Sequence, residues 1–175
     1  MKTFNPFIIF VSLLTLSLAT ACGNDDDSSS PGSRITIDGV DYELISGLIT
    51  STAGDEPGTF ETAVVLTGDG LSISASGDLN GRGTVVVAQF VTNVANELPN
   101  GTYTVAAGTF EGAGAIVDLE IDNSNFIEIT TADQLTGTAV TVDGLAGAKT
   151  IVQNFTRQNG SSGSLNFVGE LQEVF

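Results

Sequence analysis

Three carboxylates alternate with apolar residues near the middle of the chain: Asp118, Glu120 and Asp122. On a β-strand, residues two positions apart lie about 6.5 to 7 Å apart on one face, which falls in the range for the two carboxyl groups of an inverting glycosidase. The same face could offer ligands to Ca²⁺, although a calcium site needs six or more oxygens from several loops. Strict alternation is also what a solvated sheet face opposite a core face produces, and we adopt this simpler interpretation.

Few other residues could do chemistry. Lys149 is the only lysine besides Lys2, and its place beside a predicted turn favours a surface charge over a nucleophile. Tyr42 and Tyr103 could stack on sugar rings, but their strand positions favour core packing. The chain has no histidine, which is the usual proton-transfer residue near neutral pH and the commonest zinc ligand. We therefore expect no catalytic residues, no metal site apart from the calcium alternative, no cofactor and no enzymatic activity.

The first residues have the features of a secretory signal. Lys2 precedes an apolar run from Phe7 to Ala19, which is shorter than the about 20 residues of a membrane span. Small residues fill positions 19–21, directly before Cys22, the single cysteine. This stretch resembles the lipobox of bacterial lipoproteins, in which the cysteine is acylated and becomes the new N-terminus after cleavage. The resemblance implies a lipid anchor on Cys22 that attaches the protein to a membrane.

The segment after the cysteine is acidic and rich in serine, glycine and proline, so it cannot bury apolar area. We expect residues 1–21 to be a signal peptide, residues 22–33 a flexible tether that carries the lipid, and residues 34–175 a single domain. Acidic residues just after an acylated cysteine resemble the surface-export signal of Bacteroidota lipoproteins. This resemblance implies attachment to the outer membrane with the domain exposed at the cell surface, and a periplasm-facing location is the alternative.

Charge and cysteine content narrow the partners and the means of stabilisation. The chain carries 21 acidic and 5 basic residues, with a net charge of −16. Such a surface repels phosphate backbones, which excludes nucleic acid as a partner. A single cysteine excludes an intramolecular disulfide, but 41% hydrophobic residues in 175 suffice for one globular core.

Turn signals separate short segments rich in threonine, valine and isoleucine, and no convincing amphipathic helix is present. Asp-Gly pairs, the strongest short hairpin signal, occur at positions 38–39 and 143–144. This pattern predicts an all-β domain of about ten strands, an antiparallel β-sandwich or a closed β-barrel. The predicted strands are Arg34–Ile37, Val40–Ile45, Phe60–Thr67, Leu71–Ser76, Gly83–Thr92, Thr102–Ala106, Ala115–Ile121, Phe126–Thr130, Gly137–Val142, Ala148–Arg157 and Ser164–Leu171.

Apolar positions within these strands predict the core. In the segment that carries the three carboxylates, Val117, Leu119 and Ile121 are expected on one face, and the Val-rich strand Gly83–Thr92 is expected to be buried on both faces. The remaining predicted core residues are Ile37, Tyr42, Leu44, Val65, Val85, Val87, Phe90, Tyr103, Val140, Val142, Ile151, Phe155, Leu165 and Phe167.

Three stretches, Ile37–Leu44, Leu98–Val105 and Gly163–Leu171, together resemble small all-β lipoproteins of Bacteroidota. The resemblance implies a fold and a cellular address, and it carries no catalytic residues. We therefore expect a non-catalytic binding or structural module at the cell envelope, with a glycan or a protein as its partner. The alternatives are a lipocalin-like carrier of a small apolar ligand and a glycosidase that uses two of the carboxylates.

Overall fold

The computed structural model describes residues 32–73, 79–122, 125–128, 131–135, 137, 139–145, 148–157 and 159–173. The predicted signal peptide, Cys22 and the tether up to residue 31 lie outside these residues. Within them, no helix is long and apolar enough to cross a membrane. The strands are β1 (Arg34–Ile37), β2 (Val40–Ala53), β3 (Phe60–Gly68), β4 (Leu71–Ile73), β5 (Leu79–Thr92), β6 (Gly101–Thr104), β7 (Phe110–Asp122), β8 (Asn125–Glu128), β9 (Thr131–Leu135), β10 (Ala139–Leu145), β11 (Ala148–Thr156), β12 (Ser162–Gly169) and β13 (Leu171–Glu173).

The strands form one hydrogen-bonded sheet in the order β6-β10-β11-β12-β1-β2-β3-β5-β7-β8, to which β4, β9 and β13 add at the side of β5, β7 and β2. Every pairing is antiparallel except that of β13 with β2, which is parallel. The two ends of this order, β6 and β8, do not pair with each other in the described part of the chain. The prediction of an all-β domain is confirmed, whereas a closed barrel is not supported.

The predicted number of about ten strands is too low, because the described residues form thirteen. One additional strand, β9, lies in a segment for which no strand was predicted, and the other, β13, arises where one predicted strand changes its pairing partner. The predicted strand Ser164–Leu171 is divided: β12 pairs with β11 and β1 up to Gly169, and the chain then joins β2 as β13. The spacing of hydrophobic residues along the chain does not indicate which neighbouring strand a segment pairs with.

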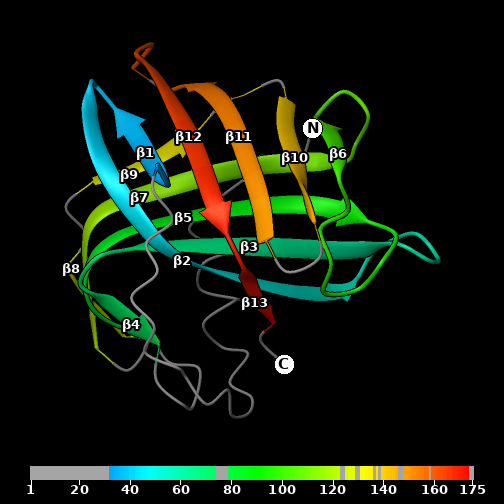
Figure 1. The fold of residues 1–175 in the computed structure, drawn as a ribbon, viewed down its shortest axis with the longest axis horizontal. Coiled ribbons are helices and arrows are strands. Elements are labelled where there is room, and N and C mark those ends of the chain that lie inside the picture. The colour runs from blue at the N-terminus through cyan, green and yellow to red at the C-terminus, as the bar shows by residue number, and fades with distance from the viewer. Residues whose placement is uncertain are drawn as a thin grey trace.

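Strand β2 joins two segments of the sheet. Its first half pairs with β1 and its second half with β3, and the register shifts between Leu44 and Ser46. We call β6, β10, β11, β12 and β1 segment A, and β3, β4, β5, β7, β8 and β9 segment B. Figure 1 shows the strands of segment A crossing over those of segment B. Gly47 permits this corner, because a Cβ there would come within 2.7 Å of Leu171 and 2.9 Å of Phe167.

The main core fills the space between the two segments. Phe90 is fully buried at its centre and contacts Tyr103 edge-on, with ring centroids 5.1 Å apart, and Phe110 at 5.4 Å. Ile35 and Phe167 of segment A belong to the same cluster as Val86 and the three aromatic rings. The predicted core residues are all buried, except that Tyr42 is half-buried against the cluster. Burial of a Phe or Leu side chain contributes roughly 1.5–3 kcal/mol, so this cluster dominates the stability of the fold.

A second apolar cluster lies on the opposite face of β3, β5 and β7, so Gly83–Thr92 is buried on both faces as predicted. It contains Val65, Leu71, Leu79, Val85, Val87, Ile116, Leu119 and Ile121. The expectation that Val117, Leu119 and Ile121 share one face is wrong, because Val117 belongs to the main core instead. The register of β7 against β5 shifts between the pairs Gly83–Leu119 and Val85–Ile116. This β-bulge adds one residue to β7 and reverses the faces of all positions after it.

The folded domain begins slightly earlier than predicted. Ser33, which we assigned to the tether, is 4% exposed. Its hydroxyl donates to the carbonyl of Val168 at 2.9 Å and accepts the amide of the same residue at 2.8 Å. Its carbonyl accepts the amide of Leu44 at 3.1 Å. Ser33 thus attaches the start of β1 to β12.

The close approach of β5 to the turn between β3 and β4 requires glycine. Gly81 has φ +112°, and a Cβ there would lie 2.0 Å from the carbonyl oxygen of Gly70, a backbone atom that cannot easily move. We predict that Gly81→Ala lowers the free energy of unfolding by roughly 1–3 kcal/mol through backbone strain and loss of this pairing. Urea unfolding of residues 32–175 measures the change. Gly101→Ala, at a site with nothing within 4 Å, is the control and should leave the midpoint unchanged.

Candidate functional site

Of the three carboxylates singled out in the sequence, only the side chain of Glu120 is described. Its Oε2 lies 3.3 Å from Nη1 of Arg82, and the two residues face each other across β7 and β5. Both side chains are largely solvated, so the ion pair contributes little, about 0–1 kcal/mol. The side chains of Asp118 and Asp122 lie outside the description, and among the described residues no cluster of three candidate ligands could hold a metal.

Two polar groups of the sequence analysis occupy ordinary structural positions. Tyr103 is 8% exposed and donates its hydroxyl to the carbonyl of Pro99 at 2.6 Å. Burial, followed by the nearby charge of Glu97, raises the pKa of the Tyr103 phenol. Lys149 donates to Oδ1 of Asn100 at 3.1 Å in an exposed contact.

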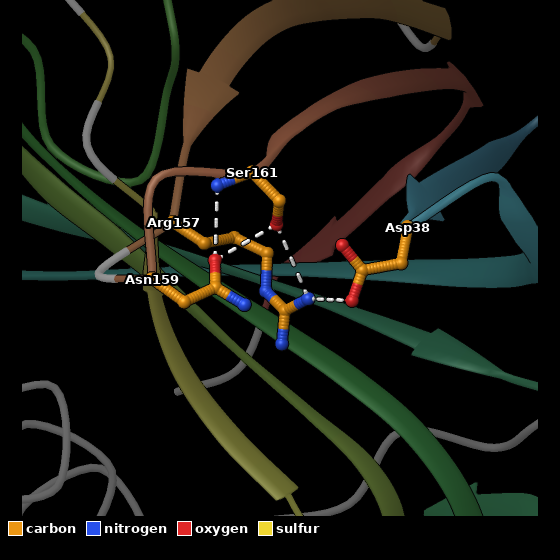
Figure 2. A network of polar contacts seen from close by, with 4 residues as sticks. All are labelled: Asp38, Arg157, Asn159 and Ser161. Atoms are coloured by element: carbon orange, nitrogen blue, oxygen red, sulfur yellow. Dashed lines mark hydrogen bonds and ion pairs between the residues drawn. The ribbon is translucent and has the colours of Figure 1, made fainter.

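A polar network that the sequence did not reveal connects two distant turns (Figure 2). Asp38, at φ +52° in the β1–β2 turn, accepts a hydrogen bond from Nη1 of Arg157, which follows β11. The same nitrogen donates to Oγ of Ser161 at 3.4 Å, and Oδ1 of Asn159 accepts both the hydroxyl (2.8 Å) and the amide (3.0 Å) of Ser161. The Arg157 side chain is only 9% exposed. This network fastens the β1–β2 hairpin to the β11–β12 loop.

The network does not activate Ser161 as a nucleophile. Hydrogen bonds from Ser161 and then Arg157 hold the pKa of the Asp38 carboxyl below its usual value, which makes this carboxylate a poor base. The Ser161 hydroxyl accepts a hydrogen bond from Nη1 of Arg157 and donates to the amide oxygen of Asn159, and neither of these groups takes up a proton. A serine nucleophile needs an adjacent general base. The arrangement therefore has a structural role.

The core also contains one polar side chain in an unusual setting. Gln153 faces inward between Ile151 and Phe155 and is 1% exposed. Neither its Oε1 nor its Nε2 has a hydrogen-bond partner in the described part of the chain. An unsatisfied buried group costs about 1–3 kcal/mol. The sequence of β11 predicts which of its residues point inward, but it does not predict that one of these inward positions holds a buried amide side chain.

The outer face of segment A is the most distinctive surface of the described domain. Because alternate residues of each strand point into the main core, the residues between them point outward. In β6, β10, β11 and β12 the outward residues are almost all uncharged. We call this surface the hydroxyl–amide face; it consists of Thr102, Thr104, Ala139, Thr141, Thr150, Val152, Asn154, Thr156, Ser162, Ser164, Asn166 and Val168.

The register aligns these residues in rows across the strands. One row runs from Thr102 through Thr141, Val152 and Asn166 to Arg34, from β6 to β1. A second row passes from Asn154 through Ser164 to Thr36. Among the described residues, charges appear only at the margins of this surface, which lie on β10 at one side and on β1 and β2 at the other.

The charged side chains at the margins of this surface interact with their immediate neighbours. At one margin, Oδ1 of Asp143 accepts the amide of Gly144 at 2.8 Å and lies 3.4 Å from Nδ2 of Asn100. At the other, Nε of Arg34 lies 3.4 Å from Oδ2 of Asp41, whose Oδ1 accepts the hydroxyl of Thr36 at 2.6 Å. The interior of the hydroxyl–amide face therefore presents donors and acceptors without net charge.

The Asp38 network makes a pH-dependent prediction. A lowered pKa in the folded state means that the charge of Asp38 stabilises the fold above the unfolded-state pKa, near 3.8, and that this contribution is lost as the pH falls through the lower folded value. Asparagine also suits a turn with positive φ, so Asp38→Asn removes the charge but keeps the turn. We predict that the variant is less stable than the parent at about pH 7, and that the difference narrows below about pH 4.

Urea midpoints of residues 32–175 at several pH values test this. Asp69→Asn, which makes the same change in the turn before β4, serves as the control. An equal loss of stability for Asp38→Asn at neutral and at acidic pH would show that the charge of Asp38 contributes nothing.

Comparison of the chain with protein-family models, with curated proteins and with solved structures gives no match. The described residues themselves offer aromatic rings packed in the core, a structural polar network and an almost uncharged outer face on an acidic protein.

Proposed function

We propose that the protein is a lipid-anchored, non-catalytic binding module of the outer membrane, and that it binds its partner through the hydroxyl–amide face. The observation that carries this proposal is the contrast in charge. A chain with 21 acidic and 5 basic residues keeps a surface that spans four strands almost free of charge. Solubility alone would favour acidic residues at these outward positions, so their absence suggests a requirement for contact with a partner.

The anchor follows from the lipobox-like residues before Cys22. Each buried acyl CH₂ contributes about 0.8 kcal/mol, so two or more long chains hold a protein firmly in a membrane. The acidic residues after Cys22 favour the outer membrane and exposure at the cell surface over a periplasm-facing location. The attachment of Ser33 to Val168 brings the start of the domain beside β12, at the edge of the hydroxyl–amide face.

The alternatives receive less support. A carrier of a small apolar ligand needs an interior space, whereas the centre of the main core is occupied by the packed rings of Phe90, Tyr103 and Phe110. Burial of both segments against these rings favours a sandwich over a closed barrel. A glycosidase needs two free carboxylates, and the pairing of Glu120 with Arg82 counts against its use in catalysis.

The proposed lipid anchor can be tested by a substitution of Cys22. We expect Cys22→Ser to abolish acylation, so that the protein moves from the detergent phase to the aqueous phase on detergent partition of cells that express it. Intact mass measurement of the parent should show an added lipid on a chain that starts at Cys22. Protease treatment of intact cells would remove the domain if it faces outward and would spare it if it faces the periplasm. A parent protein that stays in the aqueous phase would contradict the anchor.

The proposed binding role of the hydroxyl–amide face can be tested by a substitution at its centre. Val152 lies in the middle of β11 and is 40% exposed, so an arginine there places a bulky charge at the centre of the hydroxyl–amide face. We expect Val152→Arg to weaken binding of residues 32–175 to isolated cell envelopes by about tenfold or more. Thr52→Arg makes the same addition at an exposed position on the far half of β2 and should bind as the parent does. Equal binding by all three proteins would exclude this face.

A further inference from the structure

The chemistry of the hydroxyl–amide face restricts its ligand. A serine or threonine hydroxyl both donates and accepts hydrogen bonds, and an asparagine side chain offers two donors and an acceptor. Thr141, Thr150, Asn154 and Ser164 bring such groups to three neighbouring strands. We propose that the ligand of this face is a neutral polysaccharide chain, whose own hydroxyls donate and accept in the same way; this inference depends on the proposed binding function.

Charge argues for a neutral ligand. A net charge of −16 repels anionic polymers from the whole molecule. A cationic ligand would be drawn to the acidic remainder of the surface rather than to a face whose charges lie only at its margins. At one margin, Arg34 and Asp41 already pair with each other. An uncharged polymer has no electrostatic reason to avoid this face, and its hydroxyls match the groups displayed there.

Composition argues against a protein partner. Protein interfaces depend on a few buried anchors, most often Trp, Tyr and Arg, set in an apolar centre. The hydroxyl–amide face has none of these among its residues. Its apolar members are Ala139, Val152 and Val168, and the exposed Leu145 lies beyond them at the end of β10, paired with Ala148. Both tyrosines are also engaged with the main core, Tyr103 as a member and Tyr42 at its border. Many modest hydrogen bonds, rather than a few strong anchors, are what this surface can offer.

The rows of the face suit an extended chain. Neighbouring strands lie about 4.8 Å apart, so the row from Thr102 to Asn166, which crosses the four strands of the face, is about 14 Å long. A polymer that crosses the strands along this row meets a new side chain at each of them. Threonine is stiff at χ1, so its hydroxyls lose little freedom on binding. Each contact is weak, and the affinity arises from several contacts made together.

The test uses the full-length protein in detergent micelles and two cellulose derivatives with the same backbone. Hydroxyethyl cellulose is neutral, and carboxymethyl cellulose is anionic. In affinity electrophoresis we expect hydroxyethyl cellulose to retard the protein, and carboxymethyl cellulose to retard it at least about tenfold more weakly. Because the contacts are uncharged, added salt should leave the retardation by the neutral polymer unchanged.

The variant Thr141→Val/Asn154→Val removes two polar groups from exposed strand positions without loss of β-propensity. Loss of two hydrogen bonds should weaken retardation by about tenfold or more. Thr52→Val, the matched change outside the face, should retain parental binding, and thermal unfolding should be alike in all three proteins.

The possible failures are distinct. Absence of retardation by neutral polymers (hydroxyethyl cellulose, dextran and soluble starch), while Val152→Arg still weakens envelope binding, would overturn the glycan inference and leave the binding face intact. Equal or stronger retardation by carboxymethyl cellulose would overturn the neutral class of ligand. Retardation unaffected by Thr141→Val/Asn154→Val would place the glycan elsewhere. If neutral polymers do not retard the protein and Val152→Arg does not weaken its binding to envelopes, the proposed function is overturned as well.

Discussion

The structure depends on the contact of segment A with segment B through the rings around Phe90. This packing decides which residue of every strand in segment A points inward, because Val140, Ile151 and Leu165 must reach the same cluster as Phe90. A shift of one residue in any of these strands would place its buried apolar side chains in water and its outward polar side chains in the core. The hydroxyl–amide face is therefore a consequence of the core: its residues are the outward partners of the positions that the core requires.

The same packing requires the sheet to turn, and the turn is made by β2 rather than by a loop. Gly47 lets Leu171 and Phe167 approach the backbone, and the register shift after Leu44 changes the direction of the strand. Strand β13 then pairs with β2 in parallel beside this corner. A sheet built in this way can bury apolar residues on both faces of segment B, which is where the second cluster lies. The continuous apolar run of β5 follows directly from that double burial.

Local signals in the sequence were sufficient for the fold class, the hairpin at Asp38-Gly39 and most of the core, because these depend on periodicity and on positive φ in a short turn. They could not reveal the bulge in β7, since an alternating pattern looks the same whether or not an extra residue reverses its phase. The alternation alone therefore predicts one face for Val117 and Leu119, whereas the structure places them in different clusters. The contact of Asp38 with Arg157 is equally hidden in the sequence, because the two residues lie 119 positions apart and come together through the pairing of β1 with β12.

The candidate site illustrates the same distinction between residue type and position. Aspartate and glutamate, such as the carboxylates around Glu120, are candidate functional residues by their type alone. A single threonine or asparagine of β6, β10, β11 or β12 gives no such indication. Such residues become a surface only when the register brings them into rows. The residues from Cys22 to Gly32 can span at most about 40 Å, and the chain enters the domain beside Val168. A lipid on Cys22 would therefore hold this surface close to the membrane, and such tethering raises the effective concentration at which many weak contacts can act together.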